Sequence, residues 1–273
     1  MVTRVKIGGR EFQIGNKTYV MGILNATPDS FSDGGRWKEP DKALFHVEKM
    51  LKDGMDILDI GGESTRPGYT MLSEEEEIAR VIPVIEAIKS RFDIPVSLDT
   101  YKSGVAKAGL EAGIDLINDI WGLKYDPKMA QVIGESGVSC CLTHNRTEPD
   151  YRNFIQEVIQ DLEESLRLAE QGKIVRDRII LDPGVGFGKT HEQNLQTVRN
   201  LEAFQSLGCP LLLGTSRKSL IGLALDLPVA ERLEGTLVTT VMAVIKGCSF
   251  VRVHDIKENV RAIQMTEAIL YHE

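Results

Sequence analysis

The sequence predicts an α/β fold, a (β/α)8 TIM barrel with an N-terminal β-hairpin. Two observations predict it: eight short apolar runs recur along the 273 residues, and amphipathic helical stretches separate them. Apolar runs without polar alternation are typical of parallel strands that are buried on both faces. Eight strand–helix units over roughly 250 residues match the size of a TIM barrel. A doubly wound open sheet is the structural alternative, but it does not require eight units of such regularity.

The predicted strands follow one another along the whole chain. Residues 3–18 alternate around Gly8 and Gly9, which predicts a hairpin that closes the bottom of the barrel. The eight predicted strands span residues 19–25, 56–60, 95–99, 115–119, 137–144, 179–182, 210–215 and 250–255. No low-complexity tract or linker interrupts this series. We therefore expect a single domain over residues 1–273, with 1–18 as the hairpin and 19–273 as the barrel.

Several of the intervening helices carry start signals. These signals are Ser73 with Glu76, Asp126 before Pro127, and Thr190 with Gln193. The first and third are capping boxes, and the second places a capping residue before a first-turn proline. Pro83 lies inside the first of these helices and predicts a local kink. A further helix is predicted from Phe154 to near Gly172.

Composition and charge exclude several classes of protein. Hydrophobic residues make up 42% and charged residues 26%, which excludes intrinsic disorder. The net charge of −8 and the lack of a basic cluster argue against a nucleic-acid partner. The longest apolar stretch, residues 237–245, is too short to cross a membrane. No secretory signal is visible at the N-terminus, so we expect a cytoplasmic protein whose four cysteines, Cys140, Cys141, Cys209 and Cys248, are buried thiols.

Polar or charged residues stand at the C-terminal side of each predicted strand. They are Asn25, residues 61–66, Asp99, Asn118 with Asp119, His144 with Asn145, Asp182, residues 215–218, and Arg252 with His254 and Asp255. A single strand-end Asp is more often a helix cap than a catalyst. In a parallel barrel, however, all these positions converge on the face where the loops build the active site. The set therefore predicts an active site on that rim.

The chemical types in this set are specific. Asp99, Asn118 and Asp182 suit a flat heterocycle with N–H and amino donors, because an ionised carboxylate only accepts hydrogen bonds. The cations Lys218 and Arg252, with His254, suit an anionic group such as phosphate near strands seven and eight. No Ser-His-Asp elbow, phosphate-binding Walker loop or zinc-spaced cluster is present.

Three glycine-rich loops follow predicted strands. The first two, residues 25–36 and 61–68, combine glycine pairs with charged and apolar side chains. They are either plain surface loops or a lid that closes over a second substrate and excludes water. The third, with Gly184, Gly186 and Gly188, lacks the spacing of a dinucleotide fingerprint, and we interpret it as a source of loop flexibility.

Seven motifs in this chain closely resemble those of dihydropteroate synthase. They lie at residues 25–35, 59–68, 97–100, 117–120, 181–189, 214–219 and 251–255, and the match runs from about residue 19 to the end. The resemblance implies condensation of 6-hydroxymethyl-7,8-dihydropterin diphosphate with p-aminobenzoate, giving 7,8-dihydropteroate and pyrophosphate. It also implies a requirement for Mg²⁺, inhibition by sulfonamides that mimic p-aminobenzoate, and a homodimer formed through C-terminal helices.

The resemblance further implies a role for each matching residue. The pterin ring would be held by Asp99, Asn118, Asp182 and Lys218. The diphosphate would be bound by Arg252 and His254, with Mg²⁺ on Asn25, while Thr65 and Arg66 complete the diphosphate and aminobenzoate sites. The aminobenzoate pocket would be lined by Phe31, Pro67 and Ser219. The reaction itself would involve Asp182, Lys218 and Asp33, and Asp33 would close the site.

One departure and two alternatives accompany this resemblance. The family commonly has Met-His after strand five, where this chain has Thr143-His144, so we expect weaker stacking on the pterin. Pterin-binding methyltransferases that serve corrinoid proteins share the Asp/Asn pocket but need no diphosphate site. A non-catalytic paralogue that only binds pterin is the other alternative, and the presence of every expected polar residue argues against it.

Overall fold

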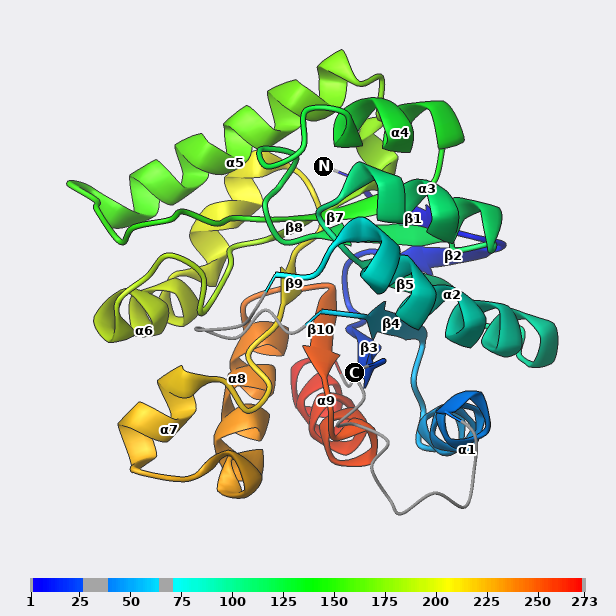
Figure 1. Cartoon of the computed structure of the whole chain (residues 1–273). Coiled ribbons are helices and arrows are strands. Elements are labelled where there is room, and N and C mark those ends of the chain that lie inside the picture. The colour runs from blue at the N-terminus through cyan, green and yellow to red at the C-terminus, as the bar shows by residue number, and fades with distance from the viewer. Residues whose placement is uncertain (1, 27–38, 64–70, 272–273) are drawn as a thin grey trace.

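Ten strands and nine α-helices occur in the part of the chain that this computed structural model describes, residues 2–26, 39–63 and 71–271 (Figure 1). The strands are β1 (Arg4–Ile7), β2 (Arg10–Gln13), β3 (Tyr19–Asn25), β4 (Ile57–Gly61), β5 (Val96–Asp99), β6 (Leu116–Asp119), β7 (Ser139–Thr143), β8 (Ile179–Asp182), β9 (Leu212–Leu213) and β10 (Phe250–Val253). The helices are α1 (Glu39–Lys52), α2 (Glu74–Arg91), α3 (Ser103–Glu111), α4 (Met129–Ser136), α5 (Phe154–Gln171), α6 (His191–Arg199), α7 (Ser219–Leu225), α8 (Leu233–Ile245) and α9 (Ile256–Tyr271).

Strands β3 to β10 form a closed parallel barrel, as predicted. Their order is β8-β7-β6-β5-β4-β3-β10-β9, so each strand pairs with its neighbour in the chain and β10 returns to β3. A parallel bridge between Leu181 and Leu211 joins β8 to β9 and closes the ring. All eight strands appear as predicted, although the seventh keeps only two of its six expected residues, in part because Pro210 has no N–H to donate to the sheet.

The N-terminal hairpin closes the bottom of the barrel, as expected. β1 and β2 pair antiparallel, with Ile7 opposite Arg10. Val5, Ile7 and Phe12 are buried against residues that begin the barrel strands, among them Tyr19 and Phe250. The Phe12 ring centroid lies 4.9 Å from that of Tyr19 in an edge-on arrangement. The interior is thus filled with apolar side chains at the N-terminal ends of the strands, which leaves the C-terminal ends for polar groups.

The helix start signals have mixed outcomes. Both predicted capping boxes form, at Ser73 before α2 and at Thr190 before α6. α5 ends at Gln171 with Gly172 as its C-cap residue, close to the expected end near Gly172. α4 begins at Met129, two residues later than Asp126-Pro127 predicts, and the Asp126 carboxylate instead accepts the N–H groups of Lys128 and Ser103. α2 continues through Pro83, whose side chain lies on the solvent face.

Candidate active site

Polar side chains converge at the C-terminal mouth of the barrel. Asp99 ends β5 and stands in register with Asn118 of β6, while Asp182 ends β8. Arg252 lies in β10, and a Cβ atom added to Gly214 would sit 3.4 Å from the Asp182 carboxylate and 3.8 Å from Cβ of Arg252. The structure therefore brings together side chains that are spread over more than 150 residues of the chain, as the strand-end pattern predicted.

An ion-pair network lies across the mouth. Arg252 places Nε 2.5 Å from Oδ2 of Asp59 and Nη2 2.6 Å from Oδ2 of Asp99. Asp59 is fully buried, and it also accepts hydrogen bonds from Ser97 Oγ at 2.5 Å and Asn118 Nδ2 at 3.3 Å. Burial raises the pKa of Asp99 to about 7, although the Arg252 charge acts in the opposite direction.

Asp182 and Lys218 form a second charged group beside this network. Asp182 accepts the N–H of Gly184 at 2.8 Å, and burial raises the pKa of its carboxyl. The Lys218 ammonium donates to the carbonyl of Val185 at 2.6 Å and lies 4.5 Å from the centroid of the Phe187 ring. Burial lowers the pKa of Lys218 to about 8, while the Asp182 carboxylate favours its charged form. Both side chains are held by the loop after β8.

His254 and its neighbours form the rim beyond β10. The ring Nδ1 of His254 lies 2.9 Å from Oγ of Ser216, which also accepts the backbone N–H of His254 at 3.2 Å. Arg217 holds Asp255 through two contacts, at 3.0 and 2.5 Å. Ser219 is exposed at the first position of α7. These contacts orient His254 at the edge of the mouth.

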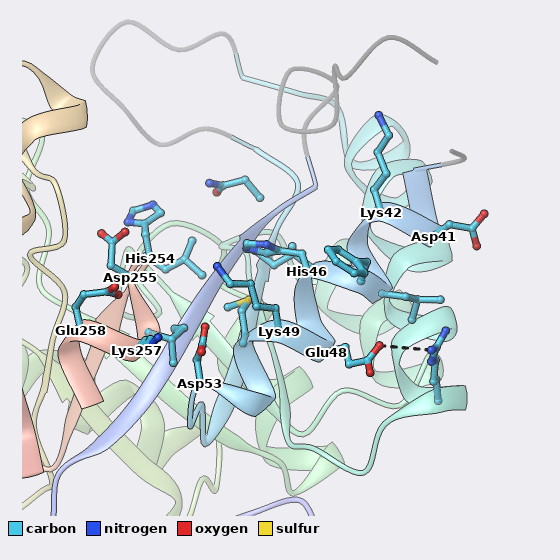
Figure 2. A pocket seen from close by; sticks show the side chains of 18 of the residues that line it. Asp41, Lys42, His46, Glu48, Lys49, Asp53, His254, Asp255, Lys257 and Glu258 are labelled. Atoms are coloured by element: carbon cyan, nitrogen blue, oxygen red, sulfur yellow. Dashed lines mark ion pairs between the residues drawn. The ribbon is translucent and has the colours of Figure 1, made fainter. Parts of the chain in front are cut away.

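A cleft of about 1110 Å³ opens next to this rim (Figure 2). Asn25, at the end of β3, lines it together with His254 and Asp255. Figure 2 shows His46 and Lys49 of α1 on the opposite side from His254 and Asp255. The cleft thus adjoins the anion-binding side of the predicted site and is not lined by the carboxylates at its centre.

Five predicted site residues lie outside the described residues: Phe31, Asp33, Thr65, Arg66 and Pro67. Ala26 and Glu63, the last described residues before them in the chain, follow the C-terminal ends of β3 and β4.

The glycines after β8 have a different role from the flexibility we expected. Gly184, Gly186 and Gly188 all have positive φ, at 73°, 87° and 53°. A Cβ atom at Gly184 would lie 1.8 Å from the carbonyl oxygen of His144, and one at Gly188 would lie 2.2 Å from that of Arg146. These positions require glycine because the loop adopts a left-handed backbone and packs against the β7–α5 loop.

Neither a membrane-spanning helix nor a metal-binding cluster occurs among the described residues. No helix among them is long and apolar enough to cross a membrane. Within the same residues, no group of three or more His, Cys, Asp or Glu side chains is arranged to hold a metal ion.

Three comparisons bear on this geometry. Residues 21–254 match the family of pterin binding enzymes. The dihydropteroate synthase of Clostridium beijerinckii is 58% identical over 97% of this chain and 99% of its own length. The chain belongs to the dihydropteroate synthase family.

A solved dihydropteroate synthase from Clostridium difficile, in the presence of pteroic acid, is 46% identical with a TM-score of 0.92, over 96% of this chain and 100% of that one. The Xanthomonas albilineans dihydropteroate synthase with 4-aminobenzoic acid is 37% identical with a TM-score of 0.94, over the full length of both chains.

Membership in the dihydropteroate synthase family makes this chain a transferase, and its activity is that of a dihydropteroate synthase. The departure at Thr143 can now be placed. Thr143 is buried at the end of β7, in register with Asp182, so its small side chain lies next to the central carboxylate. The following His144 is also buried, and its Nε2 lies 3.0 Å from Asp161.

Several polar residues of the site are not among those predicted from the sequence. Asp59 and Ser97 each lie within an otherwise apolar run, and this single polar residue is the only local sign of the hydrogen bond between them. Lys189 lies in a loop and contacts the ring of His144, 45 positions earlier in the chain, at 2.7 Å. A pairing over such a distance in the chain leaves no periodic pattern in the sequence.

Proposed function

We propose that this chain joins 6-hydroxymethyl-7,8-dihydropterin diphosphate to p-aminobenzoate, with release of pyrophosphate. The observation that carries the proposal is the charged network at the barrel mouth. There, Arg252 pairs with Asp59 of β4 and Asp99 of β5, and Lys218 interacts with Asp182 of β8. Such a set holds a polar heterocycle at its centre and an anionic group towards β10. The resemblance of the whole chain to dihydropteroate synthases supports the same substrates.

In this proposal the pterin ring binds between Asn118, Asp182 and Lys218, with Asp99 beside them. Ionised Asp182 accepts hydrogen bonds from the ring N–H and amino groups, because a carboxylate has no proton to donate. Lys218 donates to a ring acceptor. Both side chains are already held in place by the loop after β8, which reduces the entropy lost on binding.

The chemistry is a substitution at the pterin methylene carbon. The C–O bond to the diphosphate breaks, and the leaving group departs with the electron pair. The amine of p-aminobenzoate forms the new C–N bond and then loses a proton, for which we propose Asp33 as acceptor. Asp182 stabilises the positive charge that develops on the ring, and Arg252 and His254 stabilise the departing negative charge.

Arg252 is suited to this role even though it already pairs with two carboxylates. Its contacts with Asp59 and Asp99 use Nε and Nη2 of a group that carries five N–H donors. The guanidinium therefore has further donors to offer to a diphosphate oxygen. The two carboxylates fix its orientation before the substrate arrives.

We also propose that Mg²⁺ acts with the diphosphate, with the side-chain oxygen of Asn25 as a ligand. Asn25 ends β3 and lines the cleft that His254 and Asp255 share. Mg²⁺ prefers oxygen ligands, keeps several waters and often takes the rest from substrate phosphates, so a single amide oxygen fits this ion. When bound, the ion would neutralise charge on the leaving group.

The aminobenzoate is proposed to bind on the outer side of the pterin, near Ser219. Phe31, Pro67, Thr65 and Arg66 would complete this pocket. Sulfonamides that mimic p-aminobenzoate would compete for it.

The decisive experiment measures pyrophosphate release with purified protein. Release should require both substrates and Mg²⁺, and the second product should be dihydropteroate. Asp182→Asn should reduce affinity for the pterin diphosphate by about tenfold or more, because the carboxylate loses its charge. Transfer of a methyl group to a corrinoid protein, without pyrophosphate release, would contradict the proposal.

We further propose a homodimer formed through α8 and α9. These helices pack against each other, and their outer faces expose Val238, Ile245, Met265 and Ile269. Val238→Asp should convert a dimer into a monomer in size-exclusion chromatography with light scattering. Val175→Asp, an exposed position outside these two helices, is the matched control. A monomeric parent protein would contradict this arrangement.

Residues 1–273 are proposed to fold as one domain located in the cytoplasm. The packing of the hairpin against the first residues of the barrel strands supports a single unit. The four cysteines are all free and buried, as expected of a protein in a reducing compartment.

A further inference from the structure

The loop after β8 is held from inside by one lysine. The ammonium group of Lys189 lies 2.8 Å from the carbonyl oxygen of Gly184 and 3.0 Å from that of Phe187. It also lies 2.7 Å from Nδ1 of His144. Burial lowers the pKa of Lys189 to about 7. In its charged form the side chain has three N–H donors, and these three acceptors match them one for one. Lys189 therefore links two residues of the loop after β8, Gly184 and Phe187, to His144, which follows β7.

His144 is itself oriented to accept this hydrogen bond. Its Nε2 lies 3.0 Å from the carboxylate of Asp161, which also binds Nε of Arg146 at 2.6 Å. Burial lowers the pKa of His144 to about 4, so the ring is neutral at pH 7. A neutral ring that donates from Nε2 to Asp161 presents Nδ1 as an acceptor, which is the atom that Lys189 contacts.

The same loop supplies the contacts of Lys218. Lys189 binds the carbonyls of Gly184 and Phe187, and Val185 lies between these two residues in the chain. The Lys218 side chain donates to the carbonyl of Val185 and lies against the ring face of Phe187. Gly184, whose carbonyl accepts from Lys189, donates its own N–H to Asp182. A change in the path of residues 184–187 would therefore move both charged groups of the proposed pterin site.

We propose that Lys189 is a positioning residue for pterin binding, which acts by fixing the loop that holds Lys218 and Asp182. Lys189 does not contact the substrate in this view. Asn194 and Tyr151 also bind this loop, through Gly186 N–H and the Gly188 carbonyl, but among the described residues only Lys189 joins the carbonyls of Gly184 and Phe187 to His144. Without it, the left-handed glycines 184, 186 and 188 leave the backbone between these carbonyls more alternatives. This inference rests on the proposed role of Lys218 and Asp182.

A double-mutant cycle tests the inference. The variants are Lys189→Met, Lys218→Met and the two combined, and the measurement is the affinity for the pterin diphosphate by calorimetry without p-aminobenzoate. We expect each single variant to lose about tenfold in affinity and the combined variant to lose clearly less than the roughly hundredfold product of the two, because the part of the Lys189 effect that acts through Lys218 is already removed. Lys107→Met, an exposed lysine of α3, is the matched control and should bind as the parent does.

Steady-state kinetics give a second readout. In Lys189→Met the KM for the pterin diphosphate should rise about tenfold, while the KM for p-aminobenzoate stays within about twofold. A general loss of folded protein would lower the apparent kcat and leave both KM values unchanged. If Lys189→Met does not fold, Lys189→Gln, which keeps two N–H donors, replaces it in the cycle with a smaller expected loss.

The results separate a failure of the inference about Lys189 from a failure of the proposed pterin site. Losses that multiply in the combined variant, or an unchanged affinity in folded Lys189→Met, would overturn the inference and leave the proposed function intact. An unchanged affinity in Lys218→Met would overturn the proposed pterin site, and the inference with it.

Discussion

The Nε atom of Arg252 lies 2.5 Å from Oδ2 of Asp59, a carboxylate with no solvent exposure. The two residues stand 193 positions apart in the chain, on β10 and β4, which β3 separates in the sheet. A buried carboxylate without a partner is strongly disfavoured, and Arg252 supplies that partner to Asp59. The same guanidinium is proposed to bind the diphosphate. Arg252 would therefore contribute both to the stability of the fold and to substrate binding.

Replacement of Asp59 by Asn should lower the free energy of unfolding by about 3 kcal/mol, because it leaves a largely buried guanidinium with one charged partner fewer. Urea denaturation at pH 7 measures this effect. Glu11→Gln is the control, because it removes an ion pair with Arg4 that is exposed and 3.7 Å long and should change stability by less than about 1 kcal/mol. Equal stabilities of the Asp59 variant and the parent would contradict the assigned pairing.

Lys102 is the centre of a second buried ion-pair cluster, and its replacement should also lower the free energy of unfolding. Its ammonium lies 2.5 Å from Glu63 and 2.7 Å from Glu77, and it donates to the carbonyl of Leu72 at 2.9 Å. Lys102→Met would leave two buried carboxylates without a cation and should destabilise the protein by about 3–5 kcal/mol. Glu63→Gln and Glu77→Gln added to this variant should restore part of the loss. A triple variant that is less stable than Lys102→Met would show that charge is not the cause.

The stability of the protein should depend on pH through His144. Its folded pKa of about 4 lies below the ordinary value of 6.5, so the unfolded chain binds the proton first as the pH falls. Stability from this group is therefore complete above about pH 6.5 and is lost as the pH falls towards 4, by about 3 kcal/mol in total. Urea unfolding at pH 7 and pH 4.5 should show a larger drop in the parent than in His144→Gln. Parallel drops in the two proteins would exclude this role for the histidine.

The loop glycines predict a contrast between two substitutions. Gly184 has a φ of 73° and a carbonyl oxygen 1.8 Å from the position of an added Cβ, whereas Gly137 has a φ of 68° and open space around it. Gly137→Ala should therefore cost about 1 kcal/mol, for the backbone conformation alone. Gly184→Ala should cost clearly more and should also weaken pterin binding. Thermal unfolding and calorimetry test both effects, and similar losses in the two variants would count against the close packing of this loop.

The barrel was predictable from sequence because its signals are local. Runs such as residues 19–25 are apolar without alternation, and the capping boxes at Ser73 and Thr190 lie within four residues of each helix start. The start of α4 was missed by two residues because the Asp126 carboxylate binds Ser103 N–H of another helix, a contact that only folding creates. The hairpin at the bottom was predictable for the same reason as the strands, from short-range alternation around Gly8 and Gly9.

The sequence alone determined the order of the strands and helices and the polar residues at the strand ends. It also carried the motifs that resemble dihydropteroate synthase. Only the tertiary structure decided which of these residues touch. It paired Arg252 with Asp59 and Asp99, and it placed Lys189 against His144. The physical reason is that helix and strand signals depend on neighbours along the chain, whereas a buried charge is stabilised by whichever partner the closed barrel brings within about 3 Å.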